Sequence, residues 1–280
     1  MPELPEVETI VTGLQRRVAG ETIDSVWIGS RRQPLKSSPR VIARALEGKR
    51  IVRVHRAGKH IVFDLEAPDA VGGKRSGNYR RGWGHWVVHL GMTGRMVVTE
   101  PSVDVAKHTH LIARLASGRE LRFIDPRMFG RISVHSAGFD PGGVEPLEVS
   151  EDRFIELFRG RKTPIKSALL NQKLLRGVGN IYADESLFRA RICPRRRAAA
   201  VSRAELANLY HSVREVLREA IALGGSSISD YVDSDGDEGF FQLRHRVYGR
   251  ESEPCTVCGS TIRRLVIGGR SSHYCPKCQK

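Results

Sequence analysis

Residues 1–20 read MPELPEVETIVTGLQRRVAG. Apolar residues at positions 7, 10, 14 and 18 recur at steps of three and four, which predicts one amphipathic helix ending near Gly20. Acidic residues occupy its first turn, where the helix macrodipole favours negative charge. We expect the apolar face of this helix to pack against a sheet and thereby to fix the amino terminus in the fold.

Pro2 follows the initiator methionine, and removal of that methionine would make its nitrogen a secondary amine. Such an amine can attack an aldehyde-level carbon to give an iminium ion, and a free α-amino group has a reference pKa of ~7.7–8.0. Glu3 lies beside this amine in the chain and could move protons for it. Position alone also fits a second interpretation, in which Pro2 and Pro5 only stiffen the start of the helix.

The charge balance predicts a polyanionic partner. The 280 residues include 46 Lys and Arg against 31 Asp and Glu, a net charge of +15. Nucleic acid is favoured over acidic membranes, because no basic amphipathic helix is evident and the arginines are spread along the chain. No apolar run approaches the ~20 residues of a membrane span, and the acidic start does not fit a signal peptide. We therefore expect a soluble cytoplasmic protein.

Four of the five cysteines form two C-x2-C pairs, Cys255 with Cys258 and Cys275 with Cys278. This spacing is typical of a tetrahedral structural zinc site. Two disulfides are the alternative, but no secretory signal indicates an oxidising compartment. Cys193 has no partner in this pattern and is interpreted as a small buried apolar residue.

The rest of the chain divides at Pro141-Gly142-Gly143. Before this point the pattern predicts short strands, typical of a β-sandwich or barrel, at 22–28, 50–54, 60–65, 86–90, 95–99, 110–115 and 120–124. A Gly- and Arg-rich loop is predicted at 68–83. We predict domains at 1–138, 139–224 and 225–280, and thus an α+β multidomain protein.

After the boundary the periodicity is helical. Helices are predicted at 150–159 and 181–189, with another that begins at Thr163 as N-cap and Pro164 as first helical residue. Residues 202–205 read SRAE, a capping box for a helix that ends at Gly224-Gly225. A loop then leads to the cysteine module, whose strands we expect at 262–266 and 273–274.

Eight short motifs occur in order along the chain. They are MPELPEVET, RAGK (56–59), HLGMTG (89–94), DPRMFG (125–130), KTPIK (162–166), GVGNIY (177–182), VYGR (247–250) and the four-cysteine module. In this order and spacing they resemble the bacterial formamidopyrimidine-DNA glycosylase family from end to end. The resemblance implies an N-terminal β-sandwich with an N-terminal helix, a helix-two-turns-helix domain and a C-terminal C4 zinc finger. It further implies a monomer at the bacterial nucleoid that binds one structural zinc ion and holds damaged double-stranded DNA between its lobes.

The resemblance also implies an activity, the excision of oxidised purines such as 8-oxoguanine and formamidopyrimidines followed by cleavage of the abasic site. Pro2 would attack C1′ and form the Schiff base, and Glu3 would donate protons during base loss and ring opening. Lys59 would assist β-elimination, and Arg270 would contact phosphate and assist δ-elimination. Lys59 or Arg270 taken alone would be an ordinary surface charge.

DNA-binding roles follow from the same resemblance. Met92, Arg127 and Phe129 match the family's wedge, which fills the gap left by an everted nucleotide, although Met92 and Phe129 taken singly would more often be core residues. The GVGN turn could bind a phosphate through backbone amides, and 224–231 resembles the segment that covers the extruded base. Positions aligned with contacts to the DNA backbone are His108, Arg127, Arg161, Lys166, Asn180 and Tyr248.

Two departures and two alternatives remain. Met128 stands where the family often has a second Arg, and 68–83 is longer than the minimal family hairpin. The alternatives are an endonuclease VIII-like glycosylase for oxidised pyrimidines and a non-catalytic zinc protein that binds DNA. The sequence 4–9 and the Met92, Arg127 and Phe129 set favour the purine branch.

Overall fold

The computed structural model describes residues 1–67, 75–76, 79–80, 83–227 and 239–280. Two compact units divide the chain. Residues 6–140 and Met1–Pro2 belong to the first, which we call the sandwich unit, and residues 3–5, 141–226 and 240–280 belong to the second, the helical unit. The division at Asp140 and Pro141 lies at the predicted Pro-Gly-Gly boundary, and the three-domain division stays a prediction.

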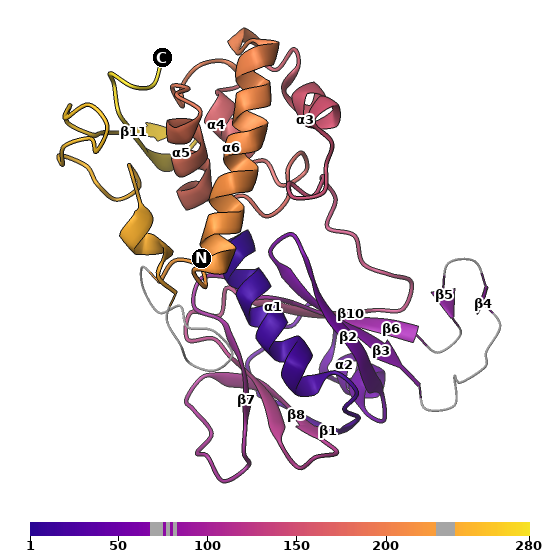
Figure 1. The fold of residues 1–280 in the computed structure, drawn as a ribbon. Helices are drawn as coiled ribbons and strands as arrows, with labels where there is room; N and C mark the ends of the chain where they lie inside the picture. Colours follow the sequence, from indigo (N-terminus) through magenta and orange to yellow (C-terminus); the bar gives the residue numbers. More distant parts are fainter. Residues whose placement is uncertain (68–74, 77–78, 81–82, 228–238) are drawn as a thin grey trace. The chain divides into compact units, whose positions relative to one another are not determined.

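The sandwich unit contains two four-stranded antiparallel sheets (Figure 1). The first sheet has the order β1 (Ile23–Ile28), β8 (Thr109–Leu115), β9 (Glu120–Ile124), β7 (Arg95–Thr99). The second has the order β10 (Arg131–His135), β6 (Trp83–His89), β3 (His60–Glu66), β2 (Arg50–Ala57). Two short paired strands, β4 (Arg75–Ser76) and β5 (Tyr79–Arg80), fall within the predicted loop at 68–83, whose other residues up to 82 lie outside the described ones.

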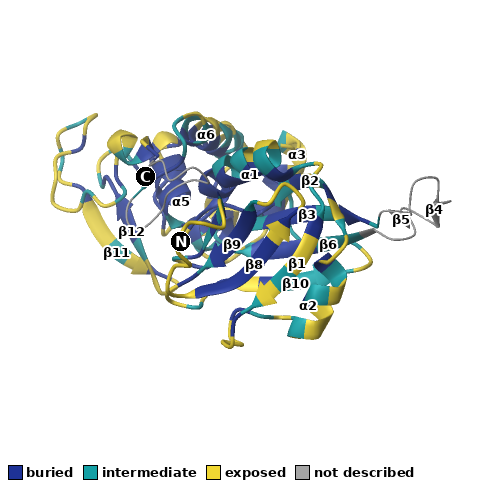
Figure 2. Ribbon diagram, turned by 90° about the horizontal axis from the view of Figure 1, so that it is seen from below, coloured by how far each residue is buried: buried dark blue, intermediate teal, exposed yellow. Residues whose placement is uncertain are grey.

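One apolar cluster fills the space between these sheets. Phe63 of β3 stacks on Trp86 of β6 with ring centroids 4.5 Å apart, and Leu111 and Phe123 of the other sheet belong to the same cluster. The helix α1 (Leu4–Val18) adds Val7, Ile10, Val11, Leu14 and Val18 to it. The expected packing of this helix on a sheet is therefore confirmed, and Figure 2 shows long buried stretches in β3, β8 and β9.

The helical unit is built from several short helices, one helix of 20 residues and one small hairpin. Its elements are α3 (Glu151–Phe158), α4 (Ile165–Leu169), α5 (Asn180–Arg189), η2 (Ala198–Ala200), α6 (Arg203–Ala222), η3 (Phe241–Arg244), β11 (Arg263–Ile267) and β12 (Arg270–Tyr274). Helices α5 and α6 pack side by side (Figure 1). The α+β class, with a strand-rich first part, a helical second part and a carboxy-terminal cysteine module, is confirmed.

Local signals placed most helix ends correctly. The capping box is present, because the Ser202 hydroxyl accepts from the Glu205 N–H while the Glu205 carboxylate accepts from the Ser202 N–H. Thr163 as N-cap is wrong. The N-cap of α4 is Pro164, which offers no side-chain acceptor, and the Ile165 N–H instead donates to the Arg196 carbonyl. This five-residue helix is thus held by tertiary contacts.

One α-helix and one strand of a four-stranded sheet are among the elements that were not predicted. Helix α2 (Pro39–Leu46) begins at Ser38, whose hydroxyl accepts from the Val41 N–H, and Pro39 follows as a helix-starting residue. Strand β10 completes the second sheet beside β6. Among the described residues no helix combines the length and apolarity that crossing a membrane requires.

Candidate DNA-binding and catalytic site

The first helix is tied to the turn that carries Lys59. Arg56 at the end of β2 pairs with Glu8 of α1, Nε to Oε2 2.6 Å, and also donates from Nη1 to the Gly58 carbonyl at 3.2 Å. Gly58 has a φ of +61°, which suits glycine in the two-residue turn between β2 and β3. The MPELPEVET and RAGK motifs, far apart in the sequence, therefore meet in the sandwich unit.

Pro2 and Lys59 are both buried, with Lys59 8% exposed. Met1 precedes Pro2 here, so the Pro2 nitrogen is still part of an amide. Burial, assisted by the charges of His60 and Lys59, lowers the pKa of His89 to about 3. His89 is therefore neutral near neutral pH, which suits its Nδ1 as acceptor of the Gly91 N–H at 3.1 Å.

Asp125 of the DPRMFG motif holds two loops together. Its carboxylate accepts from the Thr93 hydroxyl and from the Gly130 N–H, each at 2.7 Å, and its carbonyl accepts from His110 Nε2 at 2.9 Å. Gly91 packs so closely that a Cβ there would lie 2.5 Å from the Gly130 nitrogen. The HLGMTG and DPRMFG motifs thus form one rigid assembly.

The tips of these loops are exposed. Met92 is 42% and Phe129 53% exposed, and the Arg127 guanidinium carbon lies 4.9 Å from the centre of the Phe129 ring. The structure therefore brings the three predicted wedge residues to neighbouring loop tips rather than into the core. Met128 has a φ of +57°, and its N–H donates to the Asp125 carbonyl at 3.3 Å.

The Glu3 carboxyl group lies at the amino end of α5 in the helical unit. The Ile181 N–H donates to Glu3 Oε1 at 3.2 Å, and Glu3 is 4% exposed. A Cβ at Gly179 would lie 2.2 Å from the Glu3 carboxyl carbon, so only glycine permits this approach. Free N–H groups and the macrodipole at a helix start stabilise a carboxylate. The GVGN turn, expected to bind phosphate, here holds the protein's own carboxyl group.

Helix α5 carries two further acids inside a fully buried segment, 181–188. Asp184 pairs with Lys166, Oδ1 to Nζ 2.7 Å, and neither side chain has any exposed area. The other Asp184 oxygen accepts from the His273 N–H at 2.9 Å. Glu185 accepts from the three N–H groups of 246–248, at 2.8 to 3.0 Å. Burial raises the pKa of Glu185, and these bonds oppose the shift.

Several predicted site residues gather around the start of β12. Arg270 is exposed, and the next residue, Ser271, accepts through its carbonyl from Lys166 Nζ at 2.7 Å and from Asn180 Nδ2 at 3.0 Å. Burial lowers the pKa of Lys166 and raises the pKa of Tyr248. The positive charge of Arg270 lowers the pKa of both groups, so at Tyr248 it opposes the effect of burial. Both side chains bond within the protein, and the predicted contacts of Lys166 and Asn180 with DNA stay predictions.

The remaining predicted DNA contacts are exposed residues. Arg161 follows α3 in the chain, and its Nε donates to the carbonyl of Leu157 in that helix. His108 has a φ of +71°, and its carbonyl accepts from the Asp125 N–H at 3.0 Å, which places it beside the DPRMFG loop. The predicted covering segment 224–231 lies partly outside the described residues, which resume at Gly239.

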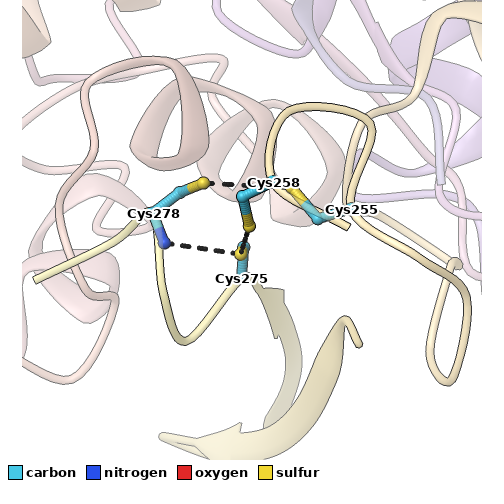
Figure 3. Close-up of side chains that lie close together, drawn as sticks. All are labelled: Cys255, Cys258, Cys275 and Cys278. Atoms are coloured by element: carbon cyan, nitrogen blue, oxygen red, sulfur yellow. Dashed lines mark hydrogen bonds between the residues drawn. The ribbon is translucent and has the colours of Figure 1, made fainter. Parts of the chain in front are cut away.

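The four cysteines of the carboxy-terminal module converge on one point (Figure 3). Their sulfur atoms all lie within 4.8 Å of one another, with Cys255 to Cys278 at 3.9 Å and Cys258 to Cys275 at 3.4 Å. A tetrahedral ion with Zn–S bonds of about 2.3 Å places its sulfur ligands about 3.8 Å apart. The site therefore fits one structural zinc ion, which would be held by these four thiolates.

Three family models together span almost the whole chain. Residues 1–132 match the formamidopyrimidine-DNA glycosylase N-terminal domain, 143–232 its H2TH domain, and 252–280 a zinc finger found in FPG and IleRS. A formamidopyrimidine-DNA glycosylase of Solibacter usitatus is 44% identical over 284 residues, covering 100% of both chains. The chain belongs to the formamidopyrimidine-DNA glycosylase family.

Solved structures of this family have the same fold. The crystal structure of MutM (Fpg) from Thermus thermophilus matches with a TM-score of 0.84 at 40% identity, covering 99% of this chain and 98% of that one. A mutant of Lactococcus lactis Fpg, in complex with Fapy-dG containing DNA, matches with a TM-score of 0.87 at 32% identity over 100% of both chains. The chain is accordingly a DNA-binding protein of the glycosylase class with a zinc finger.

The sequence interpretation missed the acids that position the glycosylase motifs. Asp125 and Glu185 each accept several backbone N–H or hydroxyl bonds, and Asp184 pairs with Lys166. A usable signal existed for two of them. Asp184 and Glu185 interrupt an apolar helix, NIYADESLF, and buried acids require partners.

Proposed function

We propose that this protein is a base-excision repair enzyme that removes oxidised purines, including 8-oxoguanine and formamidopyrimidines, and then cleaves the abasic strand. The full-length similarity to glycosylases and the net charge of +15 support this proposal. The observation that carries it is the Glu3 carboxyl group, which the Ile181 N–H holds in a buried position beside Pro2 in the chain.

Pro2 acts as the nucleophile after Met1 has been removed. Its amine attacks C1′, the glycosidic bond breaks, and the base leaves with the electron pair and a proton delivered through Glu3. Ring opening then gives an iminium ion between Pro2 and the sugar. This ion draws electrons from the adjacent carbons and so acidifies the C2′ hydrogen.

Two eliminations follow from that iminium ion. Loss of a C2′ proton breaks the C3′–O bond, so that the downstream part of the strand leaves with a 5′-phosphate end, and Lys59 assists this β-elimination. Loss of a C4′ proton breaks the 5′ C–O bond, and Arg270 assists this δ-elimination through contact with the leaving phosphate. Hydrolysis of the remaining iminium restores the Pro2 amine. Lys59, in its glycine turn, and Arg270, at the start of β12, each lie on a short hairpin.

Met92, Arg127 and Phe129 replace the everted nucleotide in the duplex. Extrusion costs a few kcal/mol of stacking and pairing, and exposed side chains on a rigid support recover part of that cost. The Arg127 guanidinium already stacks on the Phe129 ring, so little ordering remains when the wedge enters the duplex. His108, Arg161, Lys166, Asn180 and Tyr248 are proposed as contacts with the DNA backbone.

Borohydride reduction during turnover tests the nucleophile. The purified protein, its amino terminus checked by intact mass, is incubated with a duplex that carries 8-oxoguanine opposite C. We expect one DNA strand to become linked to the amino-terminal peptide. Pro2→Gly should trap less, because a primary amine remains, and a retained Met1 should abolish trapping. A trapped peptide that contains Lys59, or trapping by a protein with a blocked terminus, would show that the assignment of Pro2 is wrong.

Substrate choice separates the two enzyme branches. A second duplex carrying thymine glycol opposite A is cleaved in parallel, and we expect faster cleavage of the 8-oxoguanine duplex. Faster cleavage of thymine glycol would instead favour the endonuclease VIII-like alternative. If neither duplex is nicked by protein with a free Pro2, the non-catalytic alternative holds.

A further inference from the structure

Strands β11 and β12 form a two-stranded hairpin, so in the described part of the chain no strand pairs with the outer edge of β12. A two-residue turn, Gly268-Gly269, joins the strands, and Ile267 faces Arg270 across it. In such a hairpin hydrogen-bonded pairs alternate with non-hydrogen-bonded pairs. Ser271 and His273 therefore direct their backbone groups away from β11, and these groups need other partners.

Side chains of α4 and α5 supply those partners. The Ser271 carbonyl accepts from Lys166 and Asn180, and the His273 N–H donates to Asp184 at 2.9 Å. Asp184 also pairs with Lys166 at 2.7 Å, so one carboxylate controls both backbone positions, one directly and one through the lysine.

The environment makes this arrangement sensitive to change. The side chains of Lys166 and Asp184 have no exposed area, so each charge depends on the other for stabilisation. Arg270 immediately precedes Ser271, and its own side chain is exposed. The position of the Arg270 backbone is thus fixed by a buried ion pair that itself remains out of reach of the solvent.

We infer that Asp184, acting through Lys166 and the His273 N–H, is a positioning residue for Arg270 and thereby for the δ-elimination step. The inference rests on the proposed function of Arg270. Asp184 does not touch the substrate. A displacement of the reacting groups by about 1 Å can cost on the order of a hundredfold in rate, so loss of this support should affect the Arg270 step more than the Pro2 step.

The test uses the full-length, zinc-loaded protein and compares Asp184→Asn with the unchanged chain. Gel analysis gives the ratio of the δ product, a 3′-phosphate end, to the β product, a 3′-unsaturated aldehyde. We expect Asp184→Asn to lower this ratio by about tenfold, with a smaller loss of borohydride trapping on Pro2. Glu156→Gln is the matched control, because it removes an exposed ion pair with Arg153 in the same unit and should leave the ratio unchanged.

A second pair of variants separates positioning from general damage. On an Arg270→Ala background, Asp184→Asn should lower the ratio no further, because both changes act on the same group. An additional loss on that background, or an unchanged ratio in folded Asp184→Asn protein, would overturn the inference. If Asp184→Asn retains less than one zinc per chain, Lys166→Met with Asp184→Leu replaces it, because removal of both charges avoids an unpaired buried one.

Hydrogen exchange of residues 270–274 makes the result independent of catalysis. We expect Asp184→Asn to speed the exchange of these amides while the strands of the sandwich unit keep the rates of the unchanged protein. Unaltered exchange at Ser271 and His273 would contradict the positioning role. Absence of strand cleavage by the unchanged protein would instead contradict the proposed function, and the exchange result would still decide whether Asp184 holds β12.

Discussion

The two units of the molecule use their buried polar groups differently. In the sandwich unit, the buried Asp125 carboxylate bonds to Gly130, five positions away, and to Thr93, 32 positions away, and so joins two neighbouring loops. In the helical unit, the Ile181–Glu3 bond spans 178 positions and the Lys166–Ser271 bond spans 105. Each unit has its own apolar core, and in the helical unit polar contacts of buried side chains also join segments more than a hundred residues apart.

This difference has a consequence for stability. An apolar core tolerates substitutions that keep its volume and its apolar character, because apolar burial is non-directional. The helical unit depends in addition on a fully buried ion pair and on a four-cysteine metal site, where loss of one partner leaves an uncompensated charge. We therefore expect selective failure of the helical unit under conditions that leave the sandwich unit folded.

Zinc removal should have the largest effect. Four clustered thiolates repel one another without a dication, and structural zinc contributes about 10–16 kcal/mol of apparent binding energy in isolated zinc fingers. All three tryptophans, Trp27, Trp83 and Trp86, belong to the sandwich unit. Chelation should therefore unfold the cysteine module without a red shift of tryptophan emission. A simultaneous red shift would show that the two units unfold together.

Alanine at two glycines should separate stability from activity. In Gly91→Ala the new Cβ would lie 2.5 Å from backbone atoms, at a φ of +65° that costs about 1–2 kcal/mol for residues other than glycine. We expect a clear fall in the melting temperature of the sandwich unit. In Gly179→Ala the three atoms nearest to the new Cβ all belong to the carboxyl end of the Glu3 side chain.

The Gly179→Ala change should therefore reduce stability little but displace the Glu3 carboxyl group. We expect base excision to fall at least about tenfold, as for loss of a proton-transfer group, with a nearly unchanged thermal unfolding curve. Gly160→Ala tests the left-handed backbone alone, since nothing lies within 4 Å of its Cβ position. Normal excision by Gly179→Ala would contradict the assignment of Glu3.

Acid should destabilise both units through buried histidines. Burial lowers the pKa of His89 in the sandwich unit to about 3 and that of His245 in the helical unit to about 4. Since the unfolded value is about 6.5, both groups favour folding fully above that pH. Their contribution is lost as pH falls, towards about 3 for His89 and about 4 for His245, by at most about 1.4 kcal/mol per pH unit each.

Replacement by glutamine should remove this part of the pH dependence. Denaturant unfolding of His89→Gln between pH 6.5 and 4, followed by tryptophan emission, should give a flatter profile than the unchanged chain. His245→Gln should flatten only the transition of the helical unit. Unchanged slopes would mean that these histidines do not titrate on unfolding.

The smallest effect is expected at Glu205. The hydrogen bond from Arg196 is the main reason that its pKa lies at about 2, so its stabilisation is present above about 4.5 and is lost as pH falls towards 2. Because the side chain is 38% exposed, solvent weakens the pair. We expect Glu205→Gln to lower the free energy of unfolding by about 0.5–1 kcal/mol at pH 7, measured by urea titration. A loss above about 2 kcal/mol would make this exposed pair comparable to the buried one.

Much of the fold could be predicted from local patterns. The β-strand pattern of the sequence predicted β7 and β9 with their observed bounds, and apolar residues at steps of three and four predicted α1. Both patterns are readable because they record which side of an element faces the core. Helix α2 was not predicted because it is short, although Ser38-Pro39 is a typical start of a helix. Four cysteines at fixed spacing were sufficient for the zinc site, because the ligands of such a site lie in two short turns.

The sequence by itself thus determined the strands, the main helices, the metal site and the residue types that suit Schiff-base chemistry. Only the tertiary structure decided which groups those residues meet. It placed the Glu3 carboxyl group on Gly179, and it buried Lys166 against Asp184 instead of exposing it. The physical reason is that periodicity records solvent exposure along one segment, whereas hydrogen bonds between segments depend on chain closure over a hundred residues or more.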